Sequence, residues 1–521
     1  LTPAPPSAAM TKAFLMNSAR YMTGESANDN LWSKNQGMGE LDLGMAFDGA
    51  ARFLRDEVPA DMFTATGQIR AFAGHVVDTS KPFRVTVAWT DAPGSTAGAA
   101  YKNNLDLVVS VGTDTYKGNV FHGSNSVTGG KADGRNNVES VFLPAGTGGD
   151  FVVSVTGANI NSEGVPGAGS PVSQDFALVI YNGTATNAVA YTPVSASYSG
   201  LFYESGGPEV GKSGAVTLTT TTARAYSGKL QIGSASSAFS GTFSVIGTAT
   251  NVITRKGASP LGLMLTANVT NSDVITGTVT DGSTFTADLV ANRTVSASTG
   301  LAAFAGNYTL IFPGTNNDAQ LPGGDGYGTV SVSSSGKIKL AATLADGTKL
   351  SQSATASIDG QWPLYAPLYS GQGQILGWLQ FTNPPQGGVG GQVDWIKPQI
   401  DNAKFYPGGF NFETMVAGSA YDAGASPLIA FANGTLVFSG GNLANPFTNN
   451  VSVSGSTIKN SSSTNKLTMK FSASKGTFTG SVVNPFTGVS MPFNCVYLQN
   501  EGFGAGDFLG TDQSGGVFFG N

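Results

Sequence analysis

Short oxygen-bearing side chains gather between Trp89 and Asn137, in the runs WTDAP, NNLD and DGRNN. Calcium in proteins is held by about six to eight oxygen ligands from such side chains. The sequence therefore predicts a calcium site, with ligands Asp91, Asn104, Asp106, Asp133 and Asn137. The alternative is that these residues form Asx turns, in which the side chain satisfies the backbone groups of a tight loop.

Other residue types that could support catalysis are scarce. A serine-hydrolase triad needs a nucleophile, an imidazole base and an orienting carboxylate, and only His75 and His122 could be the base. Neither stands beside a serine at the start of a helix, so we expect ordinary surface or loop histidines. A zinc site would need more His and Cys ligands than the chain has. Cys495, the single cysteine, is expected to be a small buried hydrophobic residue.

Aromatic residues cluster in one segment of the second half of the chain. They are interleaved with Pro, Gly and Gln, an arrangement that could stack against sugar rings. The alternative is that they fill the core of a β-domain, as aromatic side chains usually do. The cluster consists of Trp362, Tyr365, Tyr369, Trp378 and Trp395.

The elements that would position the oxygen ligands are strands. Phe83, Val85, Val87 and Trp89 alternate with polar residues, and the same period of two returns over 105–109. This period is typical of half-buried strands. The runs WTDAP, NNLDLVV and DGRNNVE, in that order, resemble the jelly-roll β-domain that follows the catalytic domain of secreted subtilisin-like serine proteases. The resemblance implies a jelly-roll sandwich over 64–183, and proteases of this kind often bind calcium there.

Helical spacing comes before this region. Ser7 is a candidate N-cap, and Met10, Ala13, Phe14, Asn17 and Tyr21 fall on one face, which predicts a helix over 8–22. A second helix, with apolar residues at helical spacing from Leu43 to Leu54 facing inward, is predicted to end before Pro59. Residues 1–63 resemble the end of a subtilisin-like catalytic domain, but the serine motif GTSMA and the family's Asp and His motifs are absent from the sequence. The resemblance implies a catalytic domain upstream that would hold the polypeptide substrate, and an inert chain without it.

The remainder is repetitive. After a linker at 184–196, short strands separated by Gly-rich turns continue to the end, with approximate units at 197–294, 304–398 and 428–519. Successive hairpins of this kind predict an antiparallel barrel or stacked hairpins, in which closure removes exposed strand edges. The whole chain is thus predicted to be mainly β, with a short helical part at its start.

Composition narrows the functional classes. Charged residues make up 12% of the 521 residues, against roughly 25% in ordinary globular proteins, and Gly is abundant. The pI near 5.0 argues against nucleic acid as a partner, and no apolar run reaches the length of a membrane helix. We expect a secreted or extracellular protein, including one on a bacterial cell surface.

Two functional hypotheses follow. The first is the C-terminal region of a secreted subtilisin-like serine endopeptidase, with calcium as its cofactor. The second is a non-enzymatic exported surface protein whose β-repeat region contacts glycans or other cell-surface material. A spacer or attachment role for 197–521 fits the low charge and the repetition equally well.

Overall fold

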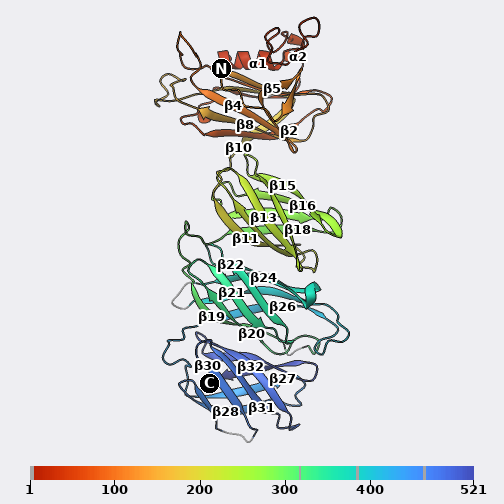
Figure 1. The fold of residues 1–521 in the computed structure, drawn as a ribbon, viewed down its shortest axis with the longest axis vertical. Helices are drawn as coiled ribbons and strands as arrows, with labels where there is room; N and C mark the ends of the chain where they lie inside the picture. Colours follow the sequence, from red (N-terminus) through yellow and green to blue (C-terminus); the bar gives the residue numbers. More distant parts are fainter. Residues whose placement is uncertain (1–4, 316–317, 383–386, 462–464) are drawn as a thin grey trace. The chain divides into compact units, whose positions relative to one another are not determined.

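The computed structural model describes residues 5–315, 318–382, 387–461 and 465–521. The chain folds into two compact units. The first comprises Leu1–Tyr191 with Val245–Gly247, and the second comprises Thr192–Ser244 with Thr248–Asn521. Strands dominate both units (Figure 1), so the prediction of a mainly β fold is confirmed. Within the described ranges, no helix combines the length and the apolar character needed to cross a membrane.

Two antiparallel sheets form the first unit. The four-stranded sheet has the order β1-β9-β3-β7, and the six-stranded sheet has the order β10-β2-β8-β4-β5-β6. One core, which includes Phe72, Val85, Leu107 and Val153, lies between them. The four strands of the first sheet are β1 (Arg52–Asp56), β3 (Phe83–Ala88), β7 (Val138–Leu143) and β9 (Ala177–Tyr181). Those of the second are β2 (Ile69–Val76), β4 (Asn104–Val111), β5 (Asp114–His122), β6 (Asn125–Thr128), β8 (Asp150–Asn159) and β10 (Gly183–Ala188).

Helix α1 (Ala8–Asn17) covers the outer face of the four-stranded sheet. Ala9, Met10 and Ala13 pack against residues of β3, β7 and β9. All six residues of β7 are therefore buried, because one face meets the core and the other meets the helix. The helix begins as predicted, with the Ser7 hydroxyl accepting a hydrogen bond from Met10 N–H at 2.9 Å. It ends at Asn17, earlier than the predicted Met22.

The second predicted helix is wrong for most of its length. Helix α2 contains only Leu43–Ala46, and residues predicted to be helical farther on form strand β1. Backbone pairing explains the difference, since β1 forms an antiparallel ladder with β9 from Arg52↔Tyr181 to Asp56↔Ala177. Leu54, predicted to face inward on a helix, is exposed. A 3-10 turn, η1 (Pro59–Asp61), follows.

The second unit contains three eight-stranded antiparallel sheets that curl into nearly closed barrels (Figure 1). The first barrel consists of β11 (Ala196–Tyr203), β12 (Gly214–Thr220), β13 (Ala225–Ile232), β14 (Ala235–Thr242), β15 (Thr248–Arg255), β16 (Ala258–Ala267), β17 (Val274–Thr280) and β18 (Thr286–Arg293). The second consists of β19 (Gly306–Phe312), β20 (Gly326–Val332), β21 (Lys337–Thr343), β22 (Lys349–Thr355), β23 (Gln361–Leu368), β24 (Gly373–Phe381), β25 (Gly388–Lys397) and β26 (Phe410–Ala420), with a 3-10 turn η2 (Tyr369–Gly371). The third consists of β27 (Asn433–Gly440), β28 (Phe447–Ser454), β29 (Thr457–Asn460), β30 (Thr468–Ser472), β31 (Thr477–Val483), β32 (Ser490–Leu498), β33 (Phe503–Leu509) and β34 (Ser514–Gly520).

Each barrel is joined through its first and last strands. β11 pairs with β18, β19 with β26 and β27 with β34. The sheet is open instead between two strands that follow each other in the chain, such as β14 and β15 or β22 and β23. The predicted second unit, 304–398, ends before β26 and so lacks the strand that joins this sheet to β19.

Alternation of apolar and polar residues places the barrel cores. In β12, Val216 and Leu218 are buried, whereas Thr217 and Thr219 between them are exposed. The same period of two recurs in β13, β21 and β22. Because side chains of a strand point alternately to opposite faces, one face of each of these four strands fills its barrel and the other carries mainly hydroxyl and lysine side chains.

Candidate functional site

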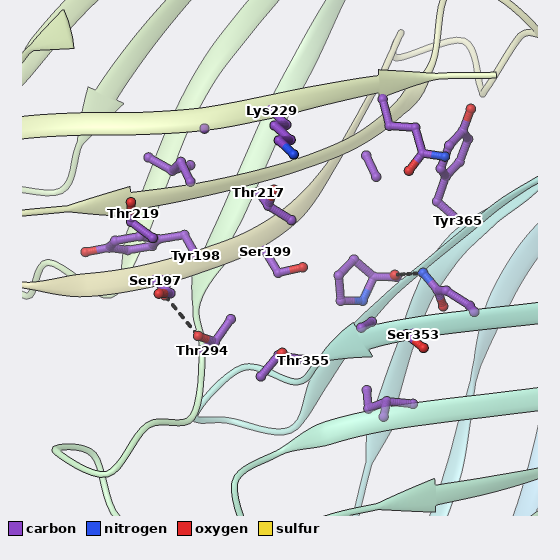
Figure 2. A pocket seen from close by; sticks show the side chains of 18 of the residues that line it. Ser197, Tyr198, Ser199, Thr217, Thr219, Lys229, Thr294, Ser353, Thr355 and Tyr365 are labelled. Carbon is purple, nitrogen blue, oxygen red and sulfur yellow. Dashed lines mark hydrogen bonds between the residues drawn. The ribbon is translucent and has the colours of Figure 1, made fainter. Parts of the chain in front are cut away.

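A groove of about 1000 Å³ lies between the outer faces of the first and second barrels, within the second unit. Figure 2 shows its two walls. Strands β11–β14 supply one wall, and strands β21–β23 supply the other. This volume lies at the upper end of what pockets for organic ligands usually have. It is an open groove, which suits a chain-like ligand.

Hydroxyl groups in register line the first wall. Ser199 pairs with Thr217, and Thr217 pairs with Lys229 on the next strand. A neighbouring row consists of Ser197, Thr219, Ser227 and Ser240. Directly opposed residues in adjacent strands lie within about 5.5 Å of each other, so each row presents closely spaced polar groups.

The second wall repeats this design with more charge. Lys337 pairs with Thr355, and Lys339 pairs with Ser353. All four point away from the core of the second barrel. Their neighbours along β21, Ile338 and Leu340, are buried and point into that core. Figure 2 shows Ser353 and Thr355 on the side opposite Ser199 and Thr217.

A small apolar contact holds the two walls together. Buried Leu201 of the first barrel packs against Tyr365 and Leu376 of the second, with Trp378 at the edge of this cluster. The Tyr365 hydroxyl accepts a hydrogen bond from Gly233 N–H at 2.6 Å. A buried amide of the second barrel also donates to the Ser213 hydroxyl of the first, at 2.6 Å. These contacts position the groove.

The groove carries positive charge in an acidic protein. The formal net charge of the chain is −6. Among the described residues, the lining contains Lys229, Lys337 and Lys339 and no Asp or Glu. No salt bridge in the described part of the chain involves these lysines, and all three are exposed. Their ammonium groups are thus available to a ligand.

The predicted calcium ligands lie in the first unit, and each has hydrogen-bond partners within the chain. The Asp91 carboxylate accepts hydrogen bonds from the N–H groups of Ala92, Lys102 and Asn103, at 2.7–2.9 Å. It therefore closes the loop that connects β3 to β4. The side chain of Asn137 donates to Trp89 C=O and accepts from Lys12 Nζ.

The other three predicted ligands lie around strands β4 and β7. Asn104 Nδ2 donates to Asp106 Oδ1 at 2.7 Å. The Asp133 carboxylate accepts hydrogen bonds from the side chains of Asn119 and Asn136. Burial raises the pKa of Asp106, and the charge of Asp133 adds to this shift. In the described residues no three His, Cys, Asp or Glu side chains are arranged to hold a metal. Calcium binding by this unit stays a prediction.

A buried acid beside these residues escaped the sequence analysis. Glu139 on β7 is 0% exposed, and its Oε2 accepts a hydrogen bond from Leu107 N–H at 2.7 Å. Its Oε1 has no hydrogen-bond partner within the described residues. Burial, with contributions from Asp106 and Asp133, raises its pKa to about 9. The signal in the sequence was a single acid inside the apolar run VESVFL.

The two histidines lie on strands β2 and β5 of the six-stranded sheet, separated by β8 and β4. His75 Nδ1 lies 2.8 Å from Asp150 Oδ1, and both side chains are largely exposed. His122 is exposed at the end of β5. Both histidines are thus at the surface, one on a strand and the other at a strand end.

The aromatic cluster fills a core instead of forming a surface. Trp362 and Trp395 are buried in the second barrel, and Trp362 stacks on Phe381 with ring centroids 5.7 Å apart. Tyr369 donates a hydrogen bond to Asp346. Tyr369 and Trp378 are half-buried, and Trp378 lies at the contact between the barrels. Cys495 is fully buried, as expected, and burial raises the pKa of its thiol.

Two carboxylates meet where the second and third barrels touch. Asp325 N–H donates to Gly506 C=O at 3.2 Å, beside Asp507 on β33. Burial raises the pKa of Asp325 to about 6. It raises the pKa of Asp507 further, and the charge of Asp325 adds to this second shift.

Comparison with solved structures finds similarity between this chain and several structures of transferrin-binding protein B. One from Haemophilus parasuis is 10% identical over 85% of this chain and 95% of its own, with a TM-score of 0.17. Intact Ap-TbpB is 11% identical over the same shares, also at 0.17. One from serogroup B Neisseria meningitidis is 11% identical over 87% and 99%, at 0.16. No protein-family model matches the chain, and no curated protein is similar to it. With TM-scores this low, these chains do not superpose as wholes, and no ligand is transferred from them.

These comparisons contradict the prediction of a subtilisin-like serine protease. No family model or curated protein supports it, and the structures named above are transferrin-binding proteins. The protease function and the catalytic-domain tail are therefore wrong, and the jelly-roll detail is unsupported. The motifs that carried the resemblance have a local cause, since Asp91 and Asp133 bond to groups of their own loops.

Proposed function

We propose that the chain is a non-enzymatic, exported β-protein that binds a polysaccharide in the groove between its first and second barrels. The observation that carries this proposal is the groove itself, with hydroxyl rows on both walls. Sugars offer hydroxyl groups that donate and accept hydrogen bonds, and Ser and Thr hydroxyls can do both in return. An open groove accepts a chain that extends beyond it at both ends.

Exposed hydroxyl groups on strands suit this task for a second reason. The backbone of each row is fixed by its ladder, so binding orders only short side chains and costs little conformational entropy. The exported location is supported by composition, because charge is low and Gly is abundant. Surface exposure also gives the groove access to polymers outside the cell.

In this proposal the groove contacts the sugar, and an aromatic platform does not. Trp378 lies at the contact between the barrels, so its replacement would disturb the geometry of the walls. A protein ligand is the competing class, and transferrin-binding protein B carries such a ligand in its name. The rows of small hydroxyl groups favour a polysaccharide, because protein-binding surfaces are enriched in exposed aromatic anchors.

The test uses the full chain and a panel of immobilised polysaccharides, with binding followed by biolayer interferometry. Ser353→Trp places a large ring between the walls and should abolish binding. Thr254→Trp is the matched control, because Thr254 is exposed on β15 of the first barrel but outside the groove. Failure of every polysaccharide to bind, or equal binding by Ser353→Trp and the parent chain, would overturn the proposal.

A further inference from the structure

Each of the three lysines of the groove is paired in register with a Ser or Thr of the neighbouring strand. Lys337 and Lys339 lie on the same face of β21, so their Cα atoms are separated by roughly 7 Å along the strand. Lys229 approaches from the opposite wall, in register with Thr217. A ligand in the groove would meet positive charge from both sides.

Their surroundings leave this charge uncompensated. All lining residues other than the three lysines are uncharged in the described part of the chain. Charges that are not paired within a protein cost little while they are hydrated, and they attract ions of opposite sign. A neutral sugar would gain nothing from them, whereas an acidic sugar would gain three charge-assisted contacts.

The residue types also separate an acidic polysaccharide from nucleic acid. Proteins that bind single-stranded nucleic acid stack bases on exposed aromatic rings. The aromatic residues of the described lining, Tyr198, Phe239 and Tyr365, are buried, at 2%, 7% and 3% exposure. Among the residues described around the groove there is no Arg, the residue best suited to bidentate phosphate contacts.

From these observations we propose that the groove selects an acidic polysaccharide, with carboxylate or sulfate groups facing Lys229, Lys337 and Lys339 and sugar hydroxyls facing the Ser and Thr rows. This inference rests on the proposed polysaccharide binding. It adds the charge class of the ligand and the residues that discriminate it. Lysine fits a flexible polymer because its ammonium is a point charge on a mobile stem, with no fixed geometry to match.

The experiment compares polygalacturonate, heparin and neutral dextran on the full chain, with polyglutamate as a charged polymer without sugar. Polygalacturonate or heparin should bind more tightly than dextran, and its binding should weaken as salt increases. The variant Lys229→Gln/Lys337→Gln/Lys339→Gln should lose at least about tenfold in affinity, since it removes all three charge-assisted contacts. All three positions are exposed, so the variant should fold.

The control variant, Lys256→Gln/Lys470→Gln/Lys475→Gln, changes the net charge equally at exposed lysines outside the groove. Its affinity should equal that of the parent chain. Equal binding of dextran and polygalacturonate, with no effect of the groove variant, would refute the charge selection and leave polysaccharide binding intact. Equal binding of polyglutamate would show that sugar is not recognised. If none of the three polysaccharides binds, both proposals fail.

Discussion

Glu139 keeps its proton in the folded chain under conditions in which an exposed glutamate is ionised. Its folded pKa of about 9 lies above the ordinary value of 4.5. Between these values the folded chain holds a proton that the unfolded chain has released, so stability falls as the pH rises. The stability that the proton on Glu139 preserves is fully present below about pH 4.5 and is lost as the pH rises through 9.

Glu139→Gln should therefore stabilise the first unit at neutral pH. Glutamine has the same shape, stays neutral, and can still accept the hydrogen bond from Leu107 N–H. At pH 7 the gain should be roughly 3 kcal/mol, from about 1.4 kcal/mol for each pH unit above the unfolded pKa. Hydrogen–deuterium exchange of peptides that cover β7, at about pH 5 and pH 8, measures it. Glu25→Gln, at an exposed position, should change nothing. If the stability of the Gln variant falls with pH as steeply as that of the parent chain, this account is wrong.

Single residues also mark what the sequence could and could not predict. Ser7 as a cap and Cys495 as a buried thiol followed from residue type and neighbours. The surroundings of Trp362 did not, because aromatic rings interleaved with Pro and Gly are equally compatible with a core and with a surface. Only the packing against Phe381 decides between the two.

At the scale of elements, local spacing failed where a distant strand competed. Residues 43–54 have helical spacing, yet β1 forms because β9, more than a hundred residues later, offers a complete ladder. Weak helix propensity over a short segment is readily overridden by such pairing. The strands of the barrels were easier to predict, because the Gly turns and the alternation of apolar and polar residues favour the same strands that the complete barrel requires.

The cap of α1 provides a test at this scale. Ser7→Ala removes the hydroxyl that accepts from Met10 N–H, and should destabilise the first unit by about 1 kcal/mol. Ser7→Thr keeps the acceptor and should cost much less. Thermal unfolding of the three chains, followed by differential scanning calorimetry, checks the order. Equal losses for Ala and Thr would contradict capping as the cause.

At the scale of the whole second unit, the pair Asp325 and Asp507 makes the contact between the second and third barrels sensitive to pH. Both pKa values are raised, chiefly by burial. Lys349 opposes the shift at Asp507, and Asp346 adds to it. The stability of this contact is greatest at low pH, where both acids are protonated in the folded and in the unfolded chain. It is lost as the pH rises through about 6, where Asp325 ionises in the folded chain.

Asp507→Asn should flatten this dependence. The amide cannot ionise, so the melting temperature of the second unit should fall less between about pH 5 and pH 8 than in the parent chain. Asp288→Asn, at an exposed position on β18, is the control. Calorimetry of the full chain at both pH values gives the comparison. Parallel declines in Asp507→Asn and the parent would show that this pair does not control the contact.

The groove could not be predicted from the sequence at all. Its hydroxyl rows have the same alternation as any solvent-facing strand, and Lys229 is separated by about a hundred residues from Lys337. The only signal was an unusual supply of Ser, Thr and Lys on one face of consecutive strands. The resemblance to a protease led to a wrong function, because motifs that stabilise local loops were taken as evidence for a whole fold.

The pairing of first and last strands governs how each barrel is made. β11 pairs with β12 early, but its other edge stays unpaired until β18 has been synthesised, and one edge of β19 likewise waits for β26. Such long-range closure is slow, because the entropy of a large loop is lost before the contact stabilises the chain. A chain emerging from the ribosome or from an export channel therefore carries one unfinished barrel at a time, with the edge of its first strand exposed. Premature termination inside a barrel leaves that edge permanently open to aggregation.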